Sequence, residues 1–121
     1  MSVTSYWLEE LHEPLPRATF AGRPEVAVIG GGVTGFSCAL TLAERGVRVR
    51  LFEAHEIAGG ASGRNGGFAL RGATEPYDLA RASLGPERAK LVMELTERSL
   101  DRMELLAGDA FRRTGSLRLA W

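Results

Sequence analysis

A short apolar run that ends in a cluster of glycines most constrains what this chain can fold into. Residues 26–29 read Val-Ala-Val-Ile, and Gly30, Gly32 and Gly35 follow in the spacing G-x-G-x-x-G. An apolar, alanine-rich segment comes next. This order predicts a buried strand, a tight turn and a helix. A helix that begins near Val33 directs free backbone N–H groups towards an anion, and the glycine spacing indicates the pyrophosphate of a dinucleotide.

The residues on either side of the glycines predict a strand–helix–strand unit. We expect a first strand over Glu25–Gly30, a crossover helix over Thr34–Arg45 ended by Gly46, and a second strand over Val47–Glu53. The unbroken apolar run of the first strand predicts burial on both faces, as in the middle of a parallel sheet. A right-handed crossover places the two strands side by side.

An acidic residue stands where such a unit binds the ribose of its ligand. Glu53 ends the second predicted strand, about 20 positions after the glycine cluster. A carboxylate there accepts hydrogen bonds from both ribose hydroxyls and repels a 2′-phosphate, which disfavours an NADP-type ligand. The alternative is an exposed charge at the end of a strand. NAD and FAD sites share this fingerprint, so the unit alone does not separate them.

A second glycine-rich segment follows, with five glycines among the eleven residues from 57 to 67. Its polar side chains suit a phosphate-bearing ligand: Ser62 offers a hydroxyl, Arg64 a positive charge, and Asn65 both donor and acceptor groups. The alternative is a glycine-rich turn with solvated polar residues.

Taken together, the two glycine-rich blocks resemble the D-amino-acid-oxidase-like superfamily of FAD-dependent oxidoreductases. The block from 61 to 67, Ala-Ser-Gly-Arg-Asn-Gly-Gly, is most similar to the gamma-glutamylputrescine oxidase branch. The segments that carry the resemblance are 5–7, 28–35, 51–53, 60–67 and 113–119.

The resemblance implies FAD as the cofactor. It places the glycines of the first block at the pyrophosphate, Glu53 at the adenosine ribose, and the segment Ala61–Gly67 around the diphosphate and ribityl chain. The residues expected to bind the cofactor are Gly30, Gly32, Val33, Thr34, Gly35, Glu53, Ala61, Ser62, Arg64, Asn65, Gly66 and Gly67.

The family resemblance further implies oxidation of a C–N bond in a small-molecule amine or amino acid. The substrate gives a hydride equivalent to the flavin, water hydrolyses the resulting imine, and oxygen commonly reoxidises the flavin. No catalytic residue is assigned, because the family builds its substrate cavity largely from a second domain. Arg71 either approaches the flavin or is a surface charge. Two other readings stay open: a nicotinamide-dependent dehydrogenase or reductase, and a truncated binding fragment without activity.

The expected fold class is α/β, a Rossmann-like FAD-binding unit with following helices and an incomplete doubly wound sheet; a small self-contained α+β domain is the alternative. We expect an N-terminal arm over 1–24, part of the FAD-binding domain over 25–115, and the start of the substrate domain over 116–121. In the arm, Trp7, Leu8 and Leu11 are expected to form one apolar face of a short helix. The arm either packs Tyr6 and Trp7 onto a domain or partner or stays poorly ordered.

After the second glycine block, helix is expected to dominate. Phe68–Arg71 is a short strand or an extended exit. Two helices follow, over Tyr77–Leu84 and from Pro86, which suits the first turn of a helix, to about Ala107. Alternating residues over 116–121 predict a final strand.

Composition excludes several partners. Fifteen basic and fifteen acidic residues give no net charge, so no nucleic acid or membrane partner is expected. No apolar run approaches the roughly 20 residues of a spanning helix, and no secretory signal is recognised, so we expect a cytoplasmic protein. Cys38 is expected to be a small buried residue. The sequence has no Cys/His cluster, so no metal site is expected. The oligomeric state stays open.

Overall fold

The computed structural model describes residues 4–9 and 22–117. These residues form two compact units that divide between Gly66 and Gly67. Each unit is described by itself.

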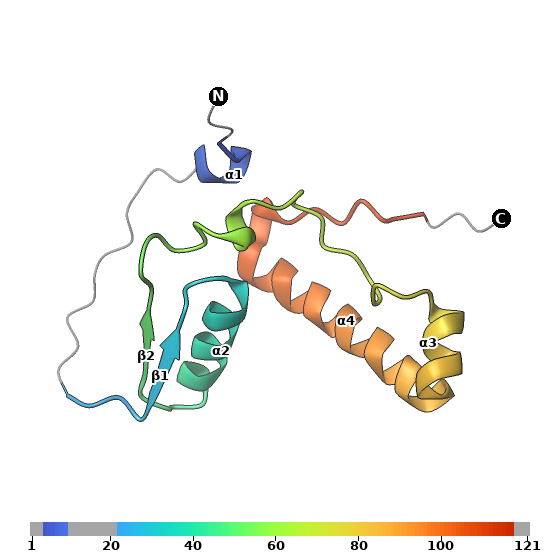
Figure 1. The fold of residues 1–121 in the computed structure, drawn as a ribbon, viewed down its shortest axis with the longest axis horizontal. Helices are drawn as coiled ribbons and strands as arrows, with labels where there is room; N and C mark the ends of the chain where they lie inside the picture. Colours follow the sequence, from blue (N-terminus) through green and yellow to red (C-terminus); the bar gives the residue numbers. More distant parts are fainter. Residues whose placement is uncertain (1–3, 10–21, 118–121) are drawn as a thin grey trace. The chain divides into compact units, whose positions relative to one another are not determined.

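The first unit is built around a parallel pair of strands (Figure 1). Its elements are α1 (Tyr6–Glu9), β1 (Val26–Ile29), α2 (Val33–Glu44), β2 (Val49–Phe52) and the 3₁₀ turn η1 (Ala61–Gly63).

The strand–helix–strand expectation is confirmed. β1 and β2 pair in parallel, from Val26 opposite Val49 to Ile29 opposite Phe52. α2 connects them and packs on both. Gly46 follows the helix with φ of +79°, and its N–H donates to the carbonyl of Ala43, as expected for a glycine just past a helix end.

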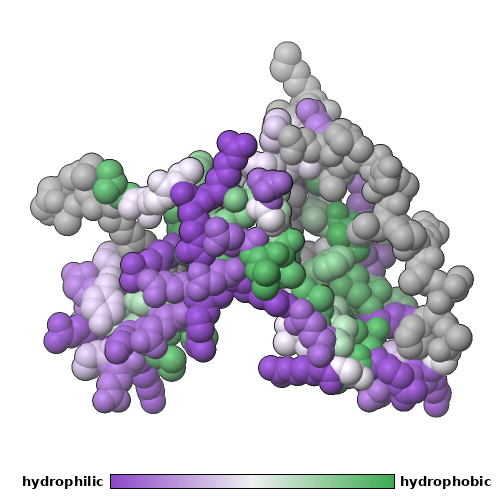
Figure 2. Space-filling model, turned by 180° about the vertical axis from the view of Figure 1, so that it is seen from behind, coloured by the Kyte–Doolittle hydropathy of each residue, from purple (hydrophilic) through white to green (hydrophobic). Residues whose placement is uncertain are grey.

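The expected burial of β1 on both faces is wrong for this structure. Ala27 and Ile29 are exposed, with Ile29 at 79% of its full accessible surface. The physical reason is that, in the described part of the chain, the sheet has two strands and α2 is the helix packed on it. A continuous apolar strand is buried on both faces only where further elements cover the other face. Apolar side chains therefore lie at the surface (Figure 2).

The same lack of cover corrects the expectation for Cys38. Its side chain lies on α2 and is exposed, and no residue of α2 is buried. One face of α2 contacts the strands, and no other helix of the described residues packs extensively on the rest of it.

The second unit is helical. α3 (Tyr77–Leu84) packs against α4 (Pro86–Ala107), and both match the predicted bounds. Gly85, with φ of +81°, joins the two helices, and Pro86 opens α4. A 3₁₀ turn, η2 (Gly108–Ala110), follows directly.

Residues 68–71 and 116–117 carry no strand pairing in the structure. Residues 68–71 form an extended exit without strand pairing, which was the other alternative for this segment. Of the final predicted strand, residues 116 and 117 are irregular and 118–121 lie outside the described residues, as does Leu11 of the arm. A strand needs a paired neighbour to satisfy its backbone, and β1 and β2 pair with each other in the other unit.

Within the described ranges, no helix combines the length and the hydropathy that crossing a membrane requires.

Candidate functional site

The turn between β1 and α2 depends on two of the predicted glycines. Gly30 has φ of +101°, a conformation that side chains with a Cβ rarely adopt. A Cβ on Gly35 would lie 1.9 Å from the carbonyl oxygen of Gly30. The helix can therefore approach the strand only because residue 35 lacks a side chain, as the glycine spacing predicted.

The start of α2 meets the second glycine-rich loop. Gly32 precedes the helix and offers no side chain to cap it. The N–H of Val33 instead donates to the hydroxyl oxygen of Ser62 at 2.9 Å. A Cβ on Gly32 would lie 3.0 Å from that oxygen. Two predicted site residues, 29 positions apart, thus meet at the helix N-terminus, where the first N–H groups have no partner within the helix.

Glu53 lies at the same turn. Its carboxylate accepts the N–H of Gly31 at 2.6 Å and the N–H of His55 at 2.9 Å. These backbone hydrogen bonds, that of Gly31 above all, lower the pKa of Glu53 below its ordinary value, so the group is ionised at neutral pH. A carboxylate offers about four acceptor positions. The remaining ones can accept ribose hydroxyls while the backbone fixes the orientation of the side chain.

Gly31 is a site residue that sequence reasoning missed. It is buried, and a Cβ there would lie 2.7 Å from Cδ1 of Ile57 and 3.1 Å from Oε2 of Glu53. Its carbonyl accepts the N–H of Ala58, a non-glycine residue with φ of +57°. The available signal was the run of three consecutive glycines, which exceeds what the G-x-G spacing needs.

The second loop is held together by its own polar groups. The amide nitrogen of Asn65 donates to the carbonyl of Ser62 at 2.6 Å. Gly63 is buried within the loop, where a Cβ would lie 2.4 Å from the carbonyl oxygen of Ala58. Arg64 is exposed. The loop is therefore ordered by its own hydrogen bonds, and the side chains of Arg64 and Asn65 are exposed at its surface.

The remaining predicted residues of the cofactor set lie around this centre. Thr34 is exposed in the first turn of α2, Ala61 opens η1, and Gly66 ends the first unit. Gly67 begins the second unit with φ of +72°.

The residues of the first unit fit the adenosine diphosphate part of a dinucleotide. The carboxylate of Glu53 and the start of α2 lie on either side of one glycine turn, where side chains at positions 31 and 35 would not fit without displacement. A carboxylate acceptor and the N–H donors of a helix start thus lie at one turn, and these are the kinds of group that bind ribose hydroxyls and a pyrophosphate.

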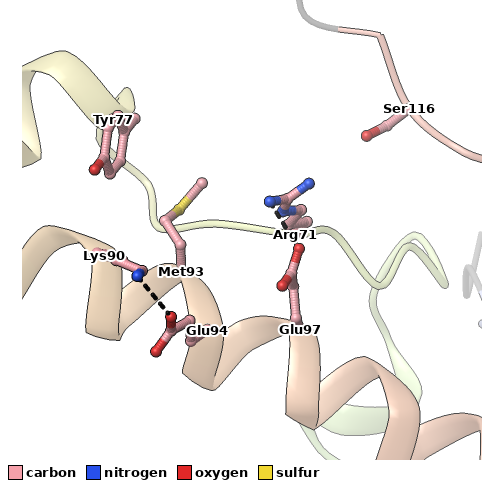
Figure 3. A pocket seen from close by; sticks show the side chains of 7 residues that line it. All are labelled: Arg71, Tyr77, Lys90, Met93, Glu94, Glu97 and Ser116. Atoms are coloured by element: carbon pink, nitrogen blue, oxygen red, sulfur yellow. Dashed lines mark ion pairs between the residues drawn. The ribbon is translucent and has the colours of Figure 1, made fainter.

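The second unit carries an open pocket of about 630 Å³ (Figure 3). Charged residues line much of it: Arg71 pairs with Glu97 at 2.7 Å, and Lys90 pairs with Glu94 at 3.6 Å. Arg71 remains 59% exposed. Within this unit Arg71 thus forms an ion pair with Glu97 at the surface.

Comparison with known proteins gives one family and several relatives. The family model described as FAD dependent oxidoreductase matches residues 25–121. "Gamma-glutamylputrescine oxidoreductase" of Escherichia coli (strain K12) is 44% identical over 68 residues, which cover 56% of this chain and 16% of that protein. "Probable oxidoreductase OrdL" of Haemophilus influenzae (strain ATCC 51907 / DSM 11121 / KW20 / Rd) is 34% identical over 101 residues, 82% of this chain and 23% of that protein.

A relative with a different substrate in its name also matches. "Glycerol-3-phosphate dehydrogenase" of Mycobacterium leprae (strain TN) is 36% identical over 101 residues, 69% of this chain and 17% of that protein. The chain thus spans less than a quarter of the length of these relatives. No solved structure matches it significantly.

Proposed function

Because the chain belongs to the DAO family of FAD-dependent oxidoreductases, we propose that it forms the adenosine diphosphate half of an FAD site in an enzyme that oxidises the C–N bond of an amine or amino acid. The observation that carries the proposal is the meeting of Glu53 and Ser62 at one glycine turn. The family's cofactor sets aside the nicotinamide alternative.

The roles of the residues follow from their groups. Glu53 would hold the adenosine ribose, and the backbone N–H groups of Thr34 and Gly35 at the positive end of α2 would bind the pyrophosphate, beside the N–H of Val33 that Ser62 holds. Ser62 supplies a hydroxyl next to those donors, and Arg64 supplies the counter-charge. Bound FAD would supply the redox chemistry, by accepting the hydride equivalent from the substrate.

The C–N specificity is supported by similarity alone. The relative that is 44% identical over 68 residues carries an amine, gamma-glutamylputrescine, in its name. Glycerol-3-phosphate dehydrogenase activity is the second candidate, since a relative of that name matches 69% of the chain. In that case the enzyme would oxidise the alcohol carbon of a phosphorylated alcohol instead. We propose a small-molecule amine or amino-acid substrate, with oxygen as the electron acceptor.

The test is a substrate panel on the protein encoded by the full reading frame that contains this chain. The purified protein is expected to show flavin absorption and to lose its visible band under anaerobic conditions when an amine or amino acid is added. Bleaching by glycerol 3-phosphate but by no amine would favour the second candidate. A protein that neither retains nor takes up flavin would contradict the FAD proposal.

Residues 1–121 alone are proposed to be inactive and poorly soluble. The exposed apolar residues support this, with Ile29 of β1 at 79% and Phe52 of β2 at 44% exposure. A soluble, cooperatively folding preparation of these residues with tightly bound FAD would contradict it.

A further inference from the structure

A hydrogen bond joins the short N-terminal helix α1 to the second glycine-rich loop. The indole N–H of Trp7 donates to the backbone carbonyl of Asn65 at 2.9 Å, across 58 positions of sequence. We propose that Trp7 is a positioning residue: together with Leu8 it holds residues 61–65 in place at the start of α2, and so sets the affinity for the part of FAD beyond its adenosine.

The indole is suited to this contact. Its N–H is a donor without acceptor capacity, so its one hydrogen bond fixes the direction of the ring. The ring also packs edge-to-face with Tyr6, with centroids 5.1 Å apart and planes at 84°. Trp7 is 41% exposed, which leaves more than half of the residue's surface covered. A residue that only decorated the surface would have neither the directed contact nor the cover.

A second contact from α1 reaches the same loop. A Cβ on Gly63 would lie 2.7 Å from Cδ2 of Leu8, so the leucine side chain occupies the space next to this buried glycine. The turn that presents both side chains is closed by the N–H groups of Leu8 and Glu9, which donate to the carbonyl of Ser5. Adjacent residues of α1 therefore touch two points of the loop, one polar and one apolar.

The contact extends to the helix N-terminus through two more hydrogen bonds. Asn65, whose carbonyl Trp7 holds, donates its side-chain amide to the carbonyl of Ser62. Ser62 in turn accepts the N–H of Val33. Loss of the Trp7 hydrogen bond thus weakens the hold on the Asn65 end of the loop, while the Glu53 side of the turn keeps its own contacts with Gly31 and His55.

Limited proteolysis tests the contact without depending on the cofactor. The protein of the full reading frame, freed of flavin, is treated with trypsin, and cleavage after the exposed Arg64 is followed by mass spectrometry. Trp7→Phe keeps an aromatic ring and removes the donor, Leu8→Ala removes the apolar contact, and Glu9→Gln on the exposed side of α1 is the control.

We expect cleavage after Arg64 to be about fivefold faster in Trp7→Phe, as one lost hydrogen bond implies, also faster in Leu8→Ala, which loses the apolar contact, and unchanged in Glu9→Gln. Cleavage after Arg45, at the far end of α2, should not change. Equal acceleration at both arginines would mean general destabilisation and overturn the proposal. No acceleration at Arg64 would overturn it too.

Ligand titration tests the link to FAD, and this part rests on the function proposed above. In Trp7→Phe we expect the Kd of FAD to rise about fivefold and that of adenosine, which lacks the diphosphate, to change less than twofold. Equal losses for both ligands, or none, would overturn the positioning role. Failure of the unchanged protein to bind either ligand would instead overturn the proposed function, and the protease result would still decide whether α1 holds the loop.

Discussion

The backbone N–H of Val33, the first residue of α2, donates to the side-chain oxygen of Ser62 over 2.9 Å. A residue from the second glycine-rich loop thus performs at this helix the task that an N-cap side chain performs elsewhere, because Gly32 has none. The consequence is that the loop and the helix start are one structural unit, in which a change on either side is felt by the other.

Ser62→Ala tests this coupling. Removal of the oxygen leaves the N–H of Val33 to water, which should lower the free energy of unfolding by about 0.5–1.5 kcal/mol. It should raise the Kd of FAD about five- to tenfold, since the loop loses its register on α2. Flavin fluorescence quenching on titration measures the affinity. The matched control is Ser37→Ala, on the exposed side of α2; equal effects of both variants would contradict the coupling.

Gly35→Ala tests the close approach of helix and strand. The new Cβ would lie 1.9 Å from the carbonyl oxygen of Gly30, which is backbone and cannot rotate away. We expect a loss of about 1–3 kcal/mol or more in the free energy of unfolding, measured with urea, because the helix must shift. Gly60→Ala is the control, since nothing lies within 4 Å of a Cβ there and its φ is −87°. A Gly35→Ala variant as stable as Gly60→Ala would show that α2 does not approach β1 this closely.

The ionisation of Glu53 predicts a pH dependence. Its pKa is lowered by the N–H groups of Gly31 and His55, so its contribution to stability is fully present above the ordinary glutamate pKa of about 4.3 and is lost as the pH falls through the lower folded value. Glu25 has its pKa lowered by Arg48 and contributes with the same sign. As the pH falls below about 5, the Glu53→Gln variant should therefore lose less stability than the unchanged protein. Some loss should remain, because Glu25 still contributes.

Thermal unfolding from about pH 7 down to the acid limit of solubility measures this dependence. Glu56→Gln, exposed in the loop after β2, is the control. An acid destabilisation of equal size in Glu53→Gln and in the unchanged protein would show that Glu53 gains nothing from its backbone donors.

Local pattern predicted the first unit well. The apolar run at 26–29 and the glycine at 35 each depend on contacts within a short stretch of chain, so periodicity and spacing capture them. The place of β2 beside β1 was expected from the right-handed crossover, and that of Glu53 near the turn from its spacing after the glycines.

What the sequence did not predict depends on distant parts of the chain. The exposure of Ile29 and Cys38 follows from what covers the sheet and the helix, which a local pattern does not contain. The link between Trp7 and Asn65 is one hydrogen bond across 58 positions and leaves no periodic trace. Gly31 was missed because the fingerprint assigns that position no requirement, whereas the structure buries it against Ile57.

Gly31→Ala, combined with a change at Ile57, separates the effect of packing against Ile57 from the effect on the orientation of Glu53. A Cβ on residue 31 meets Cδ1 of Ile57 at 2.7 Å, the movable end of a side chain, and Oε2 of Glu53 at 3.1 Å. We expect Gly31→Ala to cost about 1–3 kcal/mol in the free energy of unfolding. It should also weaken FAD binding by more than the lower stability explains, because the Glu53 carboxylate must move off the N–H of Gly31.

Ile57→Val removes the methyl group nearest to the new Cβ and by itself should cost about 0.5–1.5 kcal/mol. In the double variant we expect stability to recover by a measurable coupling of about 0.5 kcal/mol or more, since the two changes share one space. FAD affinity should stay low, since the new Cβ still crowds the carboxylate of Glu53. Recovery of affinity together with stability would mean that residue 31 acts through packing on Ile57 and that the orientation of Glu53 is not what FAD binding depends on.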